Sequence, residues 1–251
     1  MRLPSARWTI LLTALLFTGL VHAAHAQSPM AVLWRIGKQD NSDSEFALAP
    51  GGYQNYKHDG VFVVVHTHAS KSWPYVQPGP MDAWAGARVH TFRIFFGLNQ
   101  APHSPCSLQI HLLDTQDSSP PLVSISVGSF HRHFHLPPGS GDATVFGTAK
   151  TGKPTTISLS IPSYSLHKGE NEIAISTTSG SWMIYDSVDF EAPPGIQLQD
   201  LPSIGVINVR SSQWIRKPIA GHKPMQTVNV TAWNYSPAST GFEHGQHEQG
   251  L

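Results

Sequence analysis

Three large aromatic side chains stand close together in one proline-rich stretch, at Trp73, Tyr75 and Trp84. An exposed ring can stack on the apolar face of a sugar, and polar neighbours can hydrogen-bond to the sugar hydroxyls. Asp82 and Arg88 are such neighbours. We therefore predict that these five residues form a carbohydrate-binding set. In the alternative interpretation, the stretch folds over one end of the protein and its rings cap the core.

Histidines form the second group that could carry chemistry. His131, His133 and His135 alternate, so on a strand they would share one face, about 7 Å apart. His66 and His68 form another such pair. Two histidines on a strand can ligate zinc only with a third or fourth ligand and supporting partners. We favour the simpler interpretation, a polar surface strand, because 15 histidines make chance pairs common.

Oxygen-bearing side chains form the third group, in the run Asp40-Asn41-Ser42-Asp43. Such a run could hold a structural calcium ion, which prefers oxygen ligands. Asparagine and aspartate are also ordinary turn formers, and we favour that interpretation. The sequence has none of the short motifs of nucleophile elbows, phosphate-binding loops, dinucleotide sites or zinc proteases.

The elements that must position these residues are β-strands. Helical periodicity is nearly absent after residue 27, and apolar side chains alternate with polar ones in many short runs that polar turns separate. Each alternation places one row on a core and the other outward. This pattern predicts an all-β fold, an antiparallel β-sandwich. The alternating rows lie in 89–98, 107–113, 123–127, 157–161, 173–175 and 184–190, and a continuous apolar run lies in 61–65.

The two ends of the chain differ from this middle part. Residues 1–26 have a basic start, a short apolar core and a small-residue cleavage site, which predict a signal peptide cleaved after Ala26 and a secreted or periplasmic protein. The prolines of 192–195 mark a domain edge. We assign 27–192 to the sandwich and 193–251 to a linker and a poorly structured tail, or to a truncated second β domain, with weak strand candidates at 206–209 and 227–231.

Composition excludes some classes of function. The chain has 251 residues, with 16 basic and 16 acidic side chains, and only 13% of residues are charged. This even balance argues against a basic nucleic-acid binder or an acidic tail protein. Cys106 is the single cysteine, so no disulfide can form within the chain. We expect it to be a buried small residue at the start of a strand.

Three stretches and one turn carry a family resemblance. The stretches are LWRIGKQDNS with a following Glu45-Phe46, the loop of 73–86 followed by His90, and GSWMIYDSVDFE at 180–191. A turn of the kind found in galactose-binding-like jelly rolls, LHKGENEI, lies between the second stretch and the third. Together they resemble the C-terminal carbohydrate-binding-like domain of rhamnogalacturonan lyases, and the resemblance covers about residues 30–192.

The resemblance implies a jelly-roll sandwich that accompanies pectin cleavage. In that family a separate N-terminal domain carries the β-elimination, so the family's catalytic residues have no counterparts in this sequence. In galactose-binding-like folds an acidic residue of a final strand sometimes helps to hold a structural calcium ion. The resemblance implies that role for Asp186, and Asp40, from the oxygen-rich run described above, is the second candidate ligand.

We therefore predict a secreted, non-catalytic carbohydrate-binding module for pectic polysaccharide, in which Arg88 attracts galacturonate carboxylates. Structural calcium is the one cofactor we consider, and we expect neither nucleic acid nor a membrane as a partner. Two alternatives stay open. The chain could be a polysaccharide lyase or a metal-dependent glycan-active enzyme that uses the histidine pairs, or a docking domain without a ligand, in which the aromatic stretch is buried.

Overall fold

The computed structural model describes residues 30–201, 204–216 and 225–234. The predicted signal peptide, 1–26, and the polar end of the chain therefore lie outside the described residues. Within the described residues, no helix has the length and apolar character that crossing a membrane requires.

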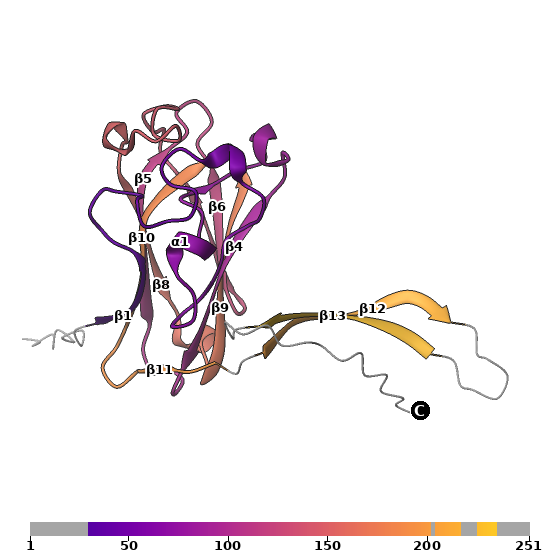
Figure 1. Cartoon of the computed structure of the whole chain (residues 1–251). Helices are drawn as coiled ribbons and strands as arrows, with labels where there is room; N and C mark the ends of the chain where they lie inside the picture. Colours follow the sequence, from indigo (N-terminus) through magenta and orange to yellow (C-terminus); the bar gives the residue numbers. More distant parts are fainter. Residues whose placement is uncertain (1–29, 202–203, 217–224, 235–251) are drawn as a thin grey trace, which may run out of the picture.

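Two β-sheets pack face to face, as Figure 1 shows. In the first sheet the strand order is β1-β10-β5-β8, and β3 pairs with one end of β10. All of these pairings are antiparallel. The strands of the first sheet are β1 (Ala31–Gly37), β3 (Val76–Gln77), β5 (Cys106–Thr115), β8 (Thr155–Ile161) and β10 (Met183–Ala192).

In the second sheet the order is β11-β4-β9-β6-β7, and β2 runs parallel to β4 while the other pairs are antiparallel. Among the residues that the structure describes, helix is confined to single turns. The predicted antiparallel β-sandwich is therefore confirmed. The strands are β2 (Val61–Val63), β4 (His90–Leu98), β6 (Leu122–Val127), β7 (Phe130–His135), β9 (Gly169–Ser179) and β11 (Leu198–Gln199). The turns are α1 (Ala69–Ser72), η1 (Tyr53–Asn55), η2 (Ala83–Ala85), η3 (Ala149–Thr151) and η4 (Ser163–Ser165).

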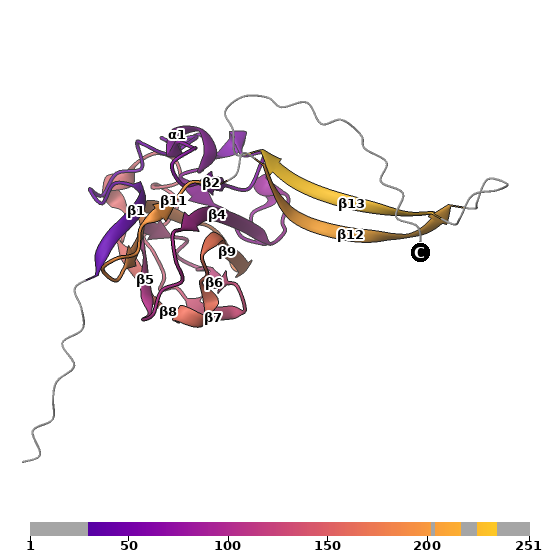
Figure 2. The same ribbon diagram turned by 90° about the horizontal axis from the view of Figure 1, so that it is seen from below.

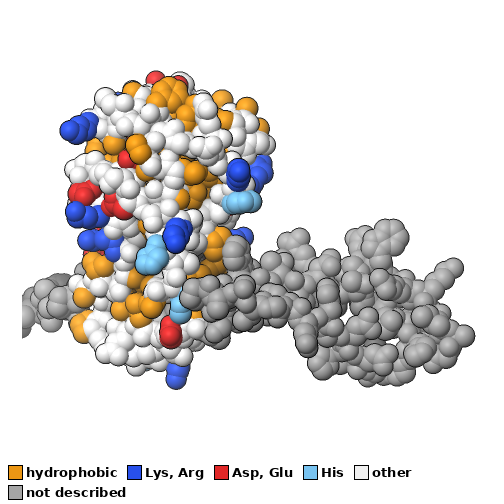
Figure 3. All heavy atoms as spheres, viewed as in Figure 1, with side chains coloured by type: hydrophobic (Ala, Val, Ile, Leu, Met, Phe, Trp, Pro, Cys, Tyr) orange, Lys and Arg blue, Asp and Glu red, His pale blue; other side chains and the backbone are white. Residues whose placement is uncertain are grey.

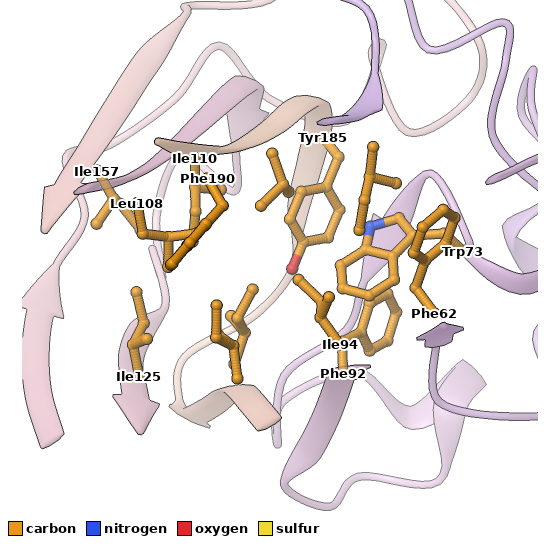
Figure 4. Packing of buried hydrophobic residues seen from close by; sticks show 14 of the residues in the cluster. Phe62, Trp73, Phe92, Ile94, Leu108, Ile110, Ile125, Ile157, Tyr185 and Phe190 are labelled. Atoms are coloured by element: carbon orange, nitrogen blue, oxygen red, sulfur yellow. The ribbon is translucent and has the colours of Figure 1, made fainter. Parts of the chain in front are cut away.

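The core lies between the two sheets and is built from the inward rows that the alternation predicts. On β4, for example, Phe92, Ile94 and Phe96 are fully buried. Aromatic rings dominate one half of this core, where Phe92 lies 5.9 Å from Tyr185 between ring centroids (Figure 4). Such large rings supply much of the apolar area that stabilises the sandwich.

The apolar run 61–65 is shorter as a strand than the sequence predicts. β2 ends at Val63, and Val65 has a left-handed φ of 76° and is 71% exposed. The chain turns at this point because the amides of His66 and Thr67 bond to the carbonyl of Val63. His66 and His68 therefore do not share a strand face, and that part of the histidine prediction is wrong.

The alternation at 184–190 predicts that Asp186 lies in the apolar row of that strand, but the structure places it elsewhere. The pairing of β10 with β5 skips it, since Tyr185 faces Leu112 and Ser187 faces His111. Such a bulge reverses the alternation locally. Tyr185 consequently points into the core, whereas Asp186 faces the turn that follows β1.

After the sandwich the chain forms one more pair of strands, β12 (Ile204–Arg216) and β13 (Met225–Asn234). These two strands pair with each other in a sheet of their own (Figure 2). β12 contains the predicted strand segment 206–209, and β13 contains the predicted segment 227–231. Both strands are longer than these segments, so this part of the tail has more regular structure than the sequence suggests. Cys106 begins β5 and is buried, which raises the pKa of its thiol to about 11.

Candidate functional site

Trp73 and Tyr75, the first two members of the predicted set, are fully buried. β3 follows directly and pairs with β10, which draws this part of the stretch into the sandwich. The Trp73 ring lies 5.0 Å from Phe92 and 5.3 Å from Tyr185 between centroids, and Figure 4 shows it inside the core. Neither ring can present a face to a sugar, so the prediction that these two residues stack on carbohydrate is wrong.

Asp82 is also buried, and its carboxylate joins its own loop to the segment that precedes β10. It accepts a hydrogen bond from the amide of Gly79 at 2.7 Å and one from the hydroxyl of Ser181 at 2.6 Å. Burial raises the pKa of Asp82 in spite of these bonds. Asp82 therefore shapes the loop and is not available to sugar hydroxyls, which corrects the prediction for this residue.

Trp84 differs from these residues, because it is only half-buried. Its ring meets Tyr53 edge-on, with centroids 5.1 Å apart, and Tyr53 lies 5.7 Å from Phe146. Tyr53 is half-buried and Phe146 is 59% exposed. We call Tyr53, Trp84 and Phe146 the aromatic patch.

Three separate loops bring the patch together. Tyr53 begins η1, Trp84 lies in η2, and Phe146 precedes η3. Figure 1 shows these turns at one end of the sandwich, and Figure 3 shows hydrophobic side chains at the surface of that end as well as elsewhere on this face. A ring cluster that is partly exposed at a loop end can stack on a sugar.

Contacts beneath the patch fix two of these loops. The hydroxyl of Tyr75 donates to the carbonyl of Val145 at 2.5 Å, which places the loop that carries Phe146. Gly51 has a φ of 70°, and a Cβ there would lie 2.6 Å from the carbonyl oxygen of Phe146. This close approach requires glycine, so the turn before Tyr53 packs directly on the loop of Phe146.

Sequence reasoning missed both Tyr53 and Phe146. Neither belongs to a run of aromatic residues, and the cluster forms only when distant loops meet. The available signals were weak: Tyr53 follows the turn Pro50-Gly51-Gly52, and Phe146 is a large ring among small and polar residues.

Arg88 follows Trp84 by four residues and lies at the surface, but it is paired. Its guanidinium donates to both oxygens of Asp59, at 2.9 and 3.2 Å. The same carboxylate binds Nδ1 of buried His90 at 2.7 Å, the hydroxyl of Tyr56 at 2.9 Å and the amide of Thr91 at 2.9 Å. Partial burial opposes ionisation, but these donors outweigh it and hold the pKa of Asp59 well below its usual value. Arg88 is thus half-exposed and already offset by one negative charge.

Asp40 and Asp186 are the predicted calcium ligands, but their surroundings do not fit a cation. Asp186 Oδ1 accepts the amides of Asp40 and Ser42, both at 3.3 Å, and the Asp40 carboxylate pairs with Lys38 at 3.1 Å. Amide hydrogens that point at a carboxylate take the place that a metal ion would need. The two residues close a turn, as in the alternative interpretation of this run.

Two other carboxylates nearby have buried oxygens without partners. Asp43 is buried, and its Oδ2 has no hydrogen-bond partner among the described residues; the same is true of the buried Oε1 of Glu45. Burial, and to a smaller degree the charge of Glu45, raise the pKa of Asp43. Unpaired buried carboxylate oxygens are costly, and calcium would supply the missing partner.

The histidines of β7 share one face, as predicted. His131, His133 and His135 are exposed, and the first two rings lie 6.2 Å apart. Among the described residues, no further side chain completes a metal site with these histidines. Across the part of the chain that the structure describes, no three histidine, cysteine, aspartate or glutamate side chains form a group that could hold a metal.

Comparison with known proteins places the sandwich in a family. The model of the family CBM-like, polysaccharide lyase family 4, domain III, matches residues 32–190. Among solved structures, a family 35 carbohydrate-binding module from an environmental isolate is 14% identical and covers 71% of this chain and 96% of its own, with a TM-score of 0.33. The family 35 module of Abf62 from Cellvibrio japonicus is also 14% identical, covers 71% and 97%, and has a TM-score of 0.32.

No curated protein matches the chain. The family match covers nearly all of the described sandwich, from β1 to β10, and it agrees with the jelly-roll resemblance of the sequence. The chain is a carbohydrate-binding-module-like protein that belongs to the family of polysaccharide lyase family 4, domain III.

Proposed function

We propose that this protein is a secreted, non-catalytic module that binds pectic polysaccharide through the aromatic patch. The observation that carries the proposal is the exposure of Phe146 beside the half-buried rings of Trp84 and Tyr53 at the loop end of the sandwich. Rings held in this way by loops on a rigid sandwich can stack on sugars at little cost in conformational entropy.

Support for a non-catalytic role comes from the family, whose model describes a module-like domain of a lyase. Support for pectic substrates comes from the sequence resemblance to rhamnogalacturonan lyases and from Arg88 near the patch. Because Asp59 already offsets Arg88, we expect stacking to supply most of the affinity and the guanidinium to supply selectivity for galacturonate. Secretion rests on the predicted signal peptide.

Affinity gel electrophoresis tests the proposal, with rhamnogalacturonan, pectin, xylan and cellulose each cast into the gel. The pectic gels should retard the native chain. Phe146→Ala should weaken binding about tenfold, because it removes roughly 1.5 kcal/mol of ring contact. Tyr164→Ala is the matched control, since Tyr164 is an exposed ring on η4 outside the patch. A folded sample that no polysaccharide retards contradicts the proposal.

A docking domain without a ligand is the second candidate. The docking hypothesis predicts that the aromatic stretch is buried, and the burial of Trp73 and Tyr75 therefore favours it. The two candidates separate by thermal denaturation, since a ligand that binds only the folded state raises Tm. A melting temperature that no glycan raises supports docking.

For calcium, we propose Asp43 and Glu45 as the ligands in place of Asp40 and Asp186. Calcium should raise the Tm of the native chain, and Asp43→Asn should abolish that shift. Asp40→Asn, on the same turn, should leave it unchanged. A shift that survives Asp43→Asn, or the lack of any shift, contradicts this assignment.

A further inference from the structure

A polar hollow lies on the outer face of the second sheet, away from the aromatic patch. Its volume is about 450 Å3, within the range of roughly 300–1,000 Å3 of small-molecule sites. The outward rows of three adjacent strands line it, from β4, β9 and β6, and the loop after η4 closes one side.

Small side chains make the floor of the hollow. In the strand register, Arg93 faces Ala174, which in turn faces Ser126; in the next row, Thr91 faces Ser176. Directly opposite residues share a face of the sheet. Because Ala174 and the two serines are short, the larger neighbouring side chains stand above them, and the floor is rich in hydroxyl groups.

Larger polar side chains stand on both sides of this floor. On one side, the guanidinium of Arg93 pairs with the carboxylate of Glu172. On the other side lies the edge strand β7, where His131 faces Ser126 and His133 faces Ser124 in the register. Both histidines are exposed and outward. These two histidines therefore extend the polar outer face from the hollow to the edge of the sheet, and we call the hollow together with this row of β7 the trough.

The charges of the trough argue against an acidic ligand. Arg93 is the one lysine or arginine among the residues that line the hollow, and its charge is offset by the carboxylate of Glu172. An added carboxylate would therefore find no unpaired lysine or arginine there. Guanidinium and carboxylate groups side by side offer hydrogen-bond donors and acceptors together, which suits the adjacent hydroxyl groups of an uncharged sugar.

We propose that this trough is a second saccharide site, which takes an uncharged glycan chain laid across β4, β9, β6 and β7. The site rests on the proposed carbohydrate-binding function but is separate from the aromatic patch. It also gives a role to the alternating histidines of β7, whose ring nitrogens would bond to sugar hydroxyls at the open edge.

Amide chemical shifts of the 15N-labelled chain test the proposal without a mutation. The probes are neutral gluco-, galacto-, manno- and xylo-oligosaccharides, with a galacturonate oligosaccharide of equal length as the acidic probe. At least one neutral probe should shift the amides of Thr91, Arg93, Ser126 and Ala174. The acidic probe should leave them unmoved.

A filling variant and a matched control sharpen the test. Ser126→Trp places a ring over the floor and should weaken binding of the neutral probe at this site by at least about tenfold. Ser160→Trp is the control, because Ser160 is an exposed serine on β8 of the other sheet. It should bind as the native chain does.

The outcomes separate this proposal from the proposed function. Amide chemical-shift changes confined to the aromatic patch contradict the second site and support binding at the patch. Shifts at the trough alone support the second site and contradict the patch. If no probe moves any amide of either region, both are wrong. Shifts at the trough that the acidic probe produces equally overturn the preference for uncharged sugars.

Discussion

The two halves of the aromatic stretch, 73–77 and 82–86, each contain a tryptophan, but the structure places these two rings in different surroundings. In the first half, Trp73 and Tyr75 are fully buried because β3 joins the sheet beside β10. In the second half, η2 forms a surface turn and leaves Trp84 half-buried. An aromatic residue in a proline-rich loop is therefore no marker of binding by itself. What decides its role is whether its backbone pairs with a strand.

Tyr56 joins the two halves physically. Its ring lies 5.9 Å from Trp84 on one side and 6.5 Å from Phe92 on the other, and Phe92 contacts Trp73. Asp59 accepts the hydroxyl hydrogen of Tyr56. The aromatic patch is thus packed, through Tyr56, on the buried half of the stretch. Substitutions in the two halves can therefore be compared by their effects on protein stability and on polysaccharide binding.

Trp73→Ala should have the largest effect on stability. It empties a fully buried site among Phe92, Tyr185 and Phe62, and we expect a loss of about 3–5 kcal/mol in the free energy of unfolding. Urea denaturation measures this loss. A loss below about 1 kcal/mol would show that the first half is not structural and would break the comparison.

Asp59→Asn should have the next largest effect, about 2–3 kcal/mol, because it removes a carboxylate that satisfies four donor groups. The pKa of Asp59 is lower in the folded than in the unfolded state, so its stabilisation is present above about pH 4 and is lost as the pH falls below that value. Unfolding curves of both proteins from pH 7 to pH 2 should converge at the acid end. A gap that stays constant over this range contradicts the prediction.

Trp84→Ala should have the smallest effect on stability, about 1–2 kcal/mol, since part of the ring is already in water. Its effect on polysaccharide binding should instead be large, at least about tenfold in the same gels. Trp84→Phe, which keeps an aromatic face, should retain part of the affinity. If Trp84→Ala binds normally, the second half is not a binding surface.

Much of the fold follows from the sequence. The period-two rows of Phe92, Ile94 and Phe96 predict the buried face of β4, and similar rows predict β5, β6, β8 and β9, because alternation is a local property of a strand. Cys106 is likewise a buried residue at the start of a strand, as predicted. Of the predicted binding residues, only Trp84 and Arg88 keep surface exposure.

The sequence by itself determined the strands, the sandwich and the family, since these depend on local periodicity and on recognisable stretches. Only the tertiary structure decided which rings are exposed. The patch needs Tyr53, Trp84 and Phe146 from three loops, and the trough needs side chains from strands far apart in the chain. Long-range pairing sets both, and the bulge at Asp186 shows that one extra residue can redirect a side chain that alternation alone would place in the core.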